Sequence, residues 1–138
     1  MVHYLLSDDL MKRILIVDDE ELILWGLSKT IRNLGNVDKE IKTVNNGKDA
    51  VAEIDTCKYD LCFLDIHIPG GDGIDLMKRI KEVSPGTKVV MMTSYDLDDV
   101  TRKEIQDNAF HFVPKPFNLP QVREIVESAL SGNGRQVQ

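Results

Sequence analysis

The sequence predicts an α/β domain in which five parallel strands form a doubly wound sheet with helices packed on both faces. Short apolar runs rich in β-branched residues, typical of strands buried on both sides, occur five times along the chain. A segment with apolar residues at helical spacing follows each run, so strands and helices alternate throughout. With 138 residues, of which 42% are hydrophobic, the chain can bury one hydrophobic core of ordinary size. It is too short for two domains that each have a core of that size.

The predicted elements begin and end at charged or turn-forming residues. The strands are expected at residues 14–17, 41–44, 60–64, 88–92 and 111–113. The helices are expected at residues 23–34, around 50–54, and at 76–83, 97–108 and 119–130. Gly35-Asn36 gives the first helix a C-terminal stop, because glycine adopts the left-handed conformation that often ends a helix. Residues 66–73 are too rich in glycine for a helix and are expected to form a loop.

The strand order follows from where the chemically active residues lie. In doubly wound sheets, ligands bind beyond the carboxyl ends of the strands, where the winding direction changes. The first, third, fourth and fifth strands are each followed by or end in an acidic, hydroxyl-bearing or basic residue that could take part in catalysis or binding. The second strand ends in Asn45-Asn46-Gly47, which is typical of a turn and a helix start. We therefore place the second strand at an edge. The resulting order is 2-1-3-4-5, in a flavodoxin-like three-layer α/β/α architecture.

Composition limits both the domain organisation and the possible functions. Residues 1–11 are expected to be an N-terminal extension, residues 12–131 the folded domain, and residues 132–138 a polar tail or linker stub. The net charge of −6 argues against direct nucleic-acid binding, which needs clustered lysine and arginine. No apolar stretch approaches a membrane span, and the first nine residues are acidic where a secretory leader would be basic. Cys57 and Cys62 are expected to be free thiols, so the sequence predicts a cytoplasmic protein.

Acidic residues follow two of the predicted strands. Asp18-Asp19-Glu20 comes directly after the first strand, and Asp65 ends the third. If Asp18, Asp19 and Asp65 meet at one sheet edge, they raise one another's pKa unless a cation lies between them. Hard oxygen ligands with room for water and a phosphate oxygen suit Mg²⁺ better than Zn²⁺. Taken alone, Asp18-Asp19 fits a helix cap equally well, and the residues after the other strands favour the metal site.

Residues suited to phosphoryl chemistry end three of the strands. A carboxylate such as Asp65, held near a metal and in line with a phosphodonor, can act as a nucleophile. Thr93 can donate its hydroxyl to a phosphoryl oxygen, and Lys115 can neutralise phosphate charge. Seen singly, each has an ordinary role: aspartate forms turns, threonine caps helices and lysine carries surface charge. The bond from Lys115 to Pro116 is a candidate cis peptide.

Together, four motifs resemble the receiver domain of two-component response regulators over about residues 12–131. They are Val17-Asp18-Asp19-Glu20, Leu64-Asp65 with the later Pro69-Gly70-Gly71-Asp72-Gly73, Met92-Thr93-Ser94, and Val113-Pro114-Lys115-Pro116-Phe117. The resemblance implies that Asp65 accepts a phosphoryl group from a histidine kinase or a phosphotransfer protein. It also implies that Mg²⁺ is held by Asp19, Asp65 and the main-chain carbonyl of His67, with Asp18 acting through water.

The same resemblance implies a switch. Thr93 and Lys115 would bind the phosphoryl oxygens, and Phe112 would be the aromatic residue that turns inward as Thr93 moves toward the phosphate. The surface around the fourth helix, fifth strand and fifth helix would then change, controlling a partner, an output domain or a homodimer. Such a domain is a signalling module that assists its own phosphorylation and dephosphorylation. It is not a conventional enzyme.

Several residues depart from the family pattern. His67 and Tyr95 stand beside the expected route of hydrolytic water and are expected to shield the acyl phosphate, unless both point to solvent. Asn108-Ala109 stands where many relatives have Gly-Ala, and asparagine tolerates the left-handed conformation of a helix end. The fourth helix is polar, which makes a hydrophobic dimer through that surface less certain. Trp25 is expected to pack within the fold.

Three alternative functions share part of this pattern. A phosphatase of the haloacid-dehalogenase type also uses a strand-end aspartate with Mg²⁺, but it needs a second acid where this chain has His67. A flavodoxin shares the predicted sheet, but Asp18-Asp19-Glu20 would repel the phosphate of its flavin. A receiver-shaped interaction module that never carries phosphate is the remaining alternative.

Overall fold

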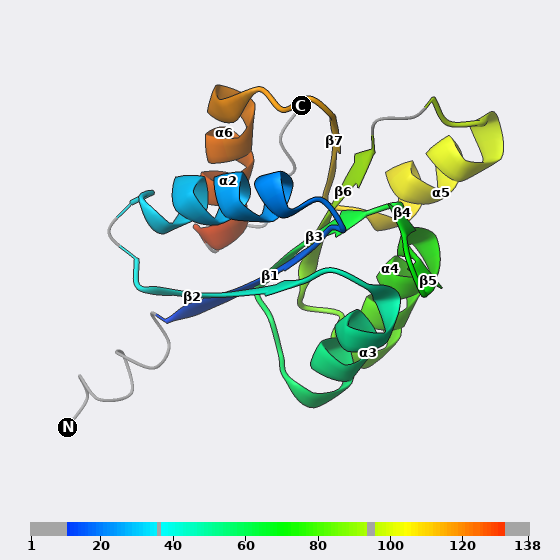
Figure 1. The fold of residues 1–138 in the computed structure, drawn as a ribbon, viewed down its shortest axis with the longest axis horizontal. Helices are drawn as coiled ribbons and strands as arrows, with labels where there is room; N and C mark the ends of the chain where they lie inside the picture. The colour runs from blue at the N-terminus through cyan, green and yellow to red at the C-terminus, as the bar shows by residue number, and fades with distance from the viewer. Residues whose placement is uncertain (1–10, 36, 94–95, 132–138) are drawn as a thin grey trace.

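The computed structural model describes residues 11–35, 37–93 and 96–131 and contains the predicted parallel sheet (Figure 1). The sheet has five strands in the order β2-β1-β3-β6-β7, which is the predicted order 2-1-3-4-5 once the two short strands β4 and β5 are set aside. Its members are β1 Lys12–Val17, β2 Lys39–Val44, β3 Leu61–Asp65, β6 Lys88–Thr93 and β7 His111–Pro114. All four neighbouring pairs run parallel, so the carboxyl ends of the strands share one edge.

Five helices cover the two faces of this sheet (Figure 1). They are α2 Glu21–Arg32, α3 Gly47–Thr56, α4 Gly73–Val83, α5 Asp99–Asn108 and α6 Leu119–Leu130. α2 and α6 pack on one face, whereas α3, α4 and α5 pack on the other. The three-layer α/β/α architecture expected from the sequence is therefore confirmed.

Alternation along the strands divides the core into two layers. Ile14 and Ile16 of β1 point toward α2 and α6, while Leu15 and Val17 point toward α3 and α4. All four side chains are fully buried, because successive residues of a strand face opposite sides of the sheet and both sides are covered. Burial of each such side chain contributes roughly 1.5–3 kcal/mol to folding. This is why the strand runs read as unbroken apolar segments in the sequence.

Four of the helices begin with a side-chain cap. Asn46, Asp72, Asp98 and Asn118 each accept a hydrogen bond from a backbone N–H in the first turn of α3, α4, α5 and α6. These are the residue types that prefer this position. α2 is different: Glu20 occupies its N-cap position and makes no side-chain cap hydrogen bond.

The chain between β3 and α4 is more ordered than a loop. β4 His67–Ile68 and β5 Gly71–Asp72 form a small antiparallel hairpin, with Gly70 at φ +71° in its turn. The glycine content that argued against a helix here also permits this tight turn, because glycine has no Cβ to clash at positive φ. The prediction of a loop at residues 66–73 was therefore wrong for these four hairpin residues.

The structure also shows the surroundings of Asn108 and Trp25, and the expectation for Trp25 was wrong. Asn108 is not left-handed, since none of the described non-glycine residues has a positive φ; it ends α5, and its side-chain amide donates to the Glu104 carbonyl at 2.9 Å. Trp25 does not pack within the fold. Its side chain on α2 is 62% exposed, and the Lys29 ammonium lies 4.7 Å from its ring centroid. The apolar face of α2 is supplied instead by Leu27 and Ile31.

Other local predictions are confirmed. Gly35 has φ +64° just beyond α2, as expected for a helix stop, although α2 itself ends at Arg32. Cys57 and Cys62 are both free, and Cys62 is buried. In the parts of the chain that the structure describes, no helix combines the length and apolar character needed to cross a lipid bilayer.

Candidate functional site

The register of the sheet brings the predicted site residues to one edge. Val17 pairs with Leu64, so Asp18, the next residue after β1, lies beside Asp65 at the end of β3. Thr93 at the end of β6 pairs with Pro114, so Lys115 follows on the neighbouring strand. These residues come from four separate strands and meet because parallel strands end on the same side.

Four carboxylates gather at this edge and form what we call the acidic pocket. One carboxylate oxygen from each of Asp18, Asp19, Glu20 and Asp65 lies within 4.8 Å of the other three. Asp18 and Asp65 are buried, whereas Asp19 and Glu20 are exposed. The hollow beside them has a volume of about 520 Å³ and is bounded on the other side by the β4–β5 hairpin. The pocket is thus open to solvent and to a ligand.

Lys115 is the cation of the acidic pocket. Its ammonium nitrogen lies 2.7 Å from Asp18 Oδ2, 2.9 Å from Glu20 Oε1 and 3.0 Å from Asp65 Oδ2, and its side chain is only 6% exposed. Burial alone would lower the pKa of Lys115, but the contacts with these carboxylates raise it above its ordinary value. The lysine is therefore charged throughout the physiological range. The bond to Pro116 is cis, as predicted.

Asp18 is the most deeply buried acid of the pocket. Its Oδ1 accepts a hydrogen bond from the Glu20 backbone N–H at 2.8 Å. Its Oδ2 is buried close to the Lys115 ammonium, yet it has no hydrogen bond with acceptable geometry among the described residues. Burial raises the pKa of Asp18, and the contacts with Lys115 and the Glu20 N–H offset this only in part.

The donor set of the acidic pocket fits a small divalent cation. It offers several carboxylate oxygens, one of them buried and lacking a hydrogen bond, and a single lysine balances only one of the four negative charges. Oxygen ligands of this kind, next to open space for water, suit Mg²⁺. Among the described residues, no histidine or cysteine side chain belongs to this cluster, although these are the most common ligands of structural zinc sites.

The backbone around Asp65 is held by close packing. Asp65 Oδ1 accepts from the His67 backbone N–H at 3.2 Å, and the Ile66 N–H donates to the Met92 carbonyl at 3.0 Å. Gly73 donates to the Ile66 carbonyl at 2.9 Å, and a Cβ added at Gly73 would collide with the Asp65 carbonyl oxygen and lie 2.7 Å from Ile66 Cα. The first residue of α4 is therefore required to be glycine for Asp65 to keep this position.

The β4–β5 hairpin is fixed from its other side by the start of α3. The Gly47 N–H donates to the Pro69 carbonyl at 2.8 Å, and a Cβ at Gly47 would lie 2.5 Å from the Gly70 carbonyl oxygen. Asn45-Asn46-Gly47 was expected to be only a turn and helix start. It also supports the wall of the acidic pocket.

The remaining predicted residues have distinct positions. Thr93 is buried at the end of β6, and its carbonyl accepts from the Lys115 N–H at 2.8 Å. Phe112 is partly buried and packs against the core layer under α3, α4 and α5. The His67 side chain is exposed on β4 at the rim of the pocket. Tyr95 lies outside the described residues, so its expected shielding role stays a prediction.

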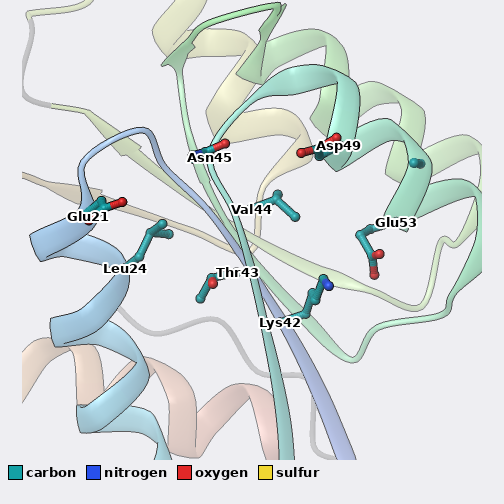
Figure 2. A pocket seen from close by; sticks show the side chains of 9 residues that line it. Glu21, Leu24, Lys42, Thr43, Val44, Asn45, Asp49 and Glu53 are labelled. Carbon is teal, nitrogen blue, oxygen red and sulfur yellow. The ribbon is translucent and has the colours of Figure 1, made fainter.

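A second hollow of about 390 Å³ lies along the edge strand β2 and contains none of the predicted site residues (Figure 2). Glu21 and Leu24 line it from α2, and Asp49 and Glu53 line it from α3. Lys42 of β2 adds a positive charge between these acids. These mixed charges do not form a metal-ligand cluster within the described residues, so the acidic pocket remains the candidate site.

Glu20 is the residue of the pocket to which sequence reasoning assigned no role. It was named as part of the acidic triplet, but only the structure shows that it contacts Lys115, 95 residues away in the sequence. The sequence did contain a signal that could have drawn attention to Glu20. Glutamate is not among the residue types that cap helix N-termini well, yet it precedes the predicted first helix.

Comparison with known proteins agrees with this geometry. Residues 14–127 match the family model described as the response regulator receiver domain. The chain is 32% identical to the DNA-binding transcriptional regulator NtrC of Salmonella typhimurium over 123 residues, covering 89% of this chain and 26% of that protein. It is 35% identical to the response regulator protein PilR of Pseudomonas aeruginosa over 119 residues, covering 86% of this chain and 26% of PilR. The chain thus spans about a quarter of the length of these relatives.

A solved structure shows the same fold. A response regulator receiver domain protein (CheY-like) from Methanospirillum hungatei JF-1 superposes with a TM-score of 0.76 and 27% sequence identity. The match covers 88% of this chain and 94% of that one.

Proposed function

The chain belongs to the response regulator receiver domain family, and we propose that it is a phosphorylation switch whose acceptor is Asp65 and whose reaction depends on Mg²⁺. The observation that carries the proposal is the position of Asp65. Its carboxylate ends β3 at the floor of the acidic pocket, within 3.0 Å of the Lys115 ammonium and beside three further carboxylates. The domain extends over residues 12–131 in this proposal.

The proposed reaction moves a phosphoryl group from a histidine to an aspartate. A carboxylate oxygen of Asp65 forms a bond to phosphorus, the P–N bond of the phosphohistidine breaks, and its electron pair returns to the imidazole. Lys115 binds a phosphoryl oxygen through its ammonium, and Thr93 donates its hydroxyl to another. Thr93 ends β6 and Lys115 directly follows β7, and both strands lie on the same side of β3, which supports these roles.

The proposed Mg²⁺ ligands are Asp19, Asp65 and the main-chain carbonyl of His67, with Asp18 acting through water. When bound, Mg²⁺ would supply positive charge to the carboxylates and to the phosphoryl oxygens, which otherwise repel one another. The unbalanced charge of the acidic pocket and the buried Asp18 Oδ2 support this assignment.

We assign the switch to Thr93 and Phe112. Movement of Thr93 toward the phosphoryl group would leave room for the partly buried Phe112 to turn inward, which would alter the surface formed by α5, β7 and α6. Phe112 packs against the core layer beneath α5 and is joined to Lys115 by three peptide bonds, so its side chain is close to both regions. A change at Asp65 can thus be transmitted to a surface outside the pocket.

The partners follow from the same reaction. The phosphodonor would be a histidine kinase or a phosphotransfer protein, and the altered surface would control an output domain, a partner or a homodimer. NtrC is a DNA-binding transcriptional regulator about four times as long as the matched region, since that region is 26% of its length. A comparable output for the protein that contains this chain is a proposal, because the chain itself has a net charge of −6 and is unsuited to bind nucleic acid.

Intact mass spectrometry tests the proposal. The wild-type protein is incubated with acetyl phosphate and Mg²⁺, beside Asp65→Asn and a sample treated with a chelator. We expect one phosphoryl adduct on the wild-type protein and none on either control. If no adduct forms, even with a phosphorylated histidine kinase as donor, the chain is a receiver-shaped interaction module that does not carry phosphate.

A further inference from the structure

The N-terminus of α2 departs from the pattern of the other helices. α3, α4, α5 and α6 start at an asparagine or aspartate whose side chain caps the first turn, whereas Glu20 at the start of α2 does not cap. Its carboxylate extends instead to Lys115, with Oε1 2.9 Å from the ammonium nitrogen. A side chain that leaves the local hydrogen bond unmade and reaches a distant catalytic lysine is placed for function and not for the helix.

The ammonium of Lys115 is surrounded by carboxylates in this state: it donates hydrogen bonds to Glu20 Oε1 and Asp65 Oδ2 and forms an ion pair with Asp18 Oδ2. It carries three protons, and three carboxylate oxygens, from Asp18, Glu20 and Asp65, lie within 3.0 Å of it. A phosphoryl oxygen on Asp65 that binds the ammonium must therefore compete with carboxylates that already contact it. Binding of a phosphoryl oxygen thus changes the contacts that Lys115 makes.

Burial identifies the contact that is exchanged. The Asp18 side chain is 0% exposed, so it would lose a buried ionic contact without gaining water. The contact of Lys115 with Asp65 is not lost in this way, because the phosphoryl group is carried by Asp65 itself and can take over that contact. The Glu20 side chain is 59% exposed and can return to solvent by a rotamer change.

Charge favours the same exchange. A phosphoryl group adds roughly 1.5 to 2 negative charges and three acceptor oxygens. Its position on Asp65 is close to the Glu20 carboxylate, since a carboxylate oxygen of each residue lies within the 4.8 Å cluster. The two anions repel each other and compete for the same ammonium.

We propose that Glu20 is a displaceable counter-ion of Lys115, which holds the lysine in the unphosphorylated state and competes with the phosphoryl group for it. The inference rests on the proposed function and adds a positioning residue that acts through Lys115. Glu20 then sets how readily the site accepts phosphate through its contact with Lys115, without itself binding the phosphoryl group.

Equilibrium binding of beryllium trifluoride, a non-covalent mimic of the phosphoryl group, tests this role. Its affinity is measured by calorimetry at a Mg²⁺ concentration that saturates each variant, for the wild-type protein, Glu20→Gln and Glu21→Gln. Glu21 is the matched control: it is the next residue, is exposed, and loses the same charge without contacting Lys115 in the described structure. An exposed ion pair of this kind predicts about a two- to fivefold tighter binding for Glu20→Gln than for Glu21→Gln.

The rate of adduct formation at low acetyl phosphate concentration provides a second readout and should rise by a similar factor in Glu20→Gln alone. Thermal unfolding of the three proteins checks that the fold is unchanged. Equal affinities of the two variants would overturn the inference, as would weaker binding by Glu20→Gln, which would make Glu20 a ligand and not a competitor. If the wild-type protein neither forms an adduct nor binds beryllium trifluoride, the proposed function itself fails, and this result is distinguishable from the other two.

Discussion

The two ends of the central sheet carry their charges in opposite ways. At the amino ends of the strands, charged groups have partners of their own: Asp60 Oδ2 accepts from the Arg13 backbone N–H at 2.9 Å, and Lys88 Nζ donates to the Ala129 carbonyl at 2.9 Å. At the carboxyl ends, four carboxylates converge and the contacts to Lys115 balance only one charge. Both ends belong to the same strands and the same register.

This difference separates structural charges from functional ones. At the amino ends, polar groups satisfy one another within the chain and stabilise the fold. At the carboxyl ends, the folded protein holds like charges together in a partly buried place, which destabilises it until a cation or another ligand arrives. This excess charge is the feature that supports the proposed cation site at the carboxyl ends.

The largest effect is expected from disrupting the backbone at the carboxyl end. Gly73→Ala would force a methyl group against the Asp65 carbonyl and Ile66 Cα, so we expect a loss of about 3 kcal/mol in the free energy of unfolding. Gly26→Ala is the control, because nothing lies within 4 Å of its added Cβ. It should raise stability by up to about 1 kcal/mol, since alanine is the better helix former. Urea denaturation measures both, and equal stabilities would contradict the packing argument.

Neutralising one carboxylate should have a smaller effect on the free energy of unfolding, and the sign of the effect should differ between the carboxyl ends and the amino ends of the strands. In buffer free of divalent ions, Asp18→Asn should raise the free energy of unfolding by about 1 kcal/mol, because burial raises the pKa of Asp18 and its charged form is costly at neutral pH. Asp60→Asn should lower it by about 0.5 kcal/mol, because a charge-assisted hydrogen bond to the Arg13 N–H becomes a neutral one.

Mg²⁺ provides the control for this pair. At about ten times its dissociation constant, a bound ion stabilises the folded state by roughly 1.4 kcal/mol. Wild-type and Asp60→Asn proteins should both gain this stability, and Asp18→Asn should gain less at the same Mg²⁺ concentration. A loss of stability in Asp18→Asn without Mg²⁺ would show that the carboxyl-end charges are structural, as they are at the other end.

The smallest effect is expected at an ion pair away from both ends. Asp55 on α3 and Arg79 on α4 form two hydrogen bonds at 2.8 and 2.9 Å, and the Arg79 contact lowers the pKa of Asp55. A lowered pKa means that the pair stabilises the fold above the ordinary pKa of aspartate and that this contribution is lost as the pH falls through the lowered value. Asp55→Asn should therefore lower the melting temperature slightly at pH 7 and leave it unchanged in acid. A difference that persists in acid would point to lost packing.

Much of the carboxyl-end site could be predicted from local sequence. Each predicted site residue ends or directly follows a strand that is apolar enough to be recognised: Asp65 and Thr93 end β3 and β6, and Asp18 and Lys115 follow β1 and β7. The parallel arrangement then brings the strand ends together without further information. The contact of Glu20 with Lys115 could not be predicted in this way. It depends on which direction one exposed side chain takes, and periodicity does not encode that direction.

The surroundings of Trp25 and Asn108 could not be predicted for the same reason, namely that they depend on the direction of individual side chains. Trp25 was expected to pack within the fold, yet it is exposed on α2 and the Lys29 ammonium lies over its ring. Asn108 was expected only to tolerate the left-handed conformation, and in the structure it does not use it: it ends α5 and its side chain donates to the Glu104 carbonyl. In both cases a side-chain environment decided the outcome.

The sequence by itself determined the strand order, the two core layers and the gathering of acids at one edge, because hydrophobic periodicity and chain direction are properties of consecutive residues. Only the tertiary structure decided how those acids share Lys115, that Gly73 and Gly47 must lack a Cβ, and that residues 67–72 form a hairpin. These features are contacts between segments distant in the chain, and their distances are set by packing, which local sequence does not specify.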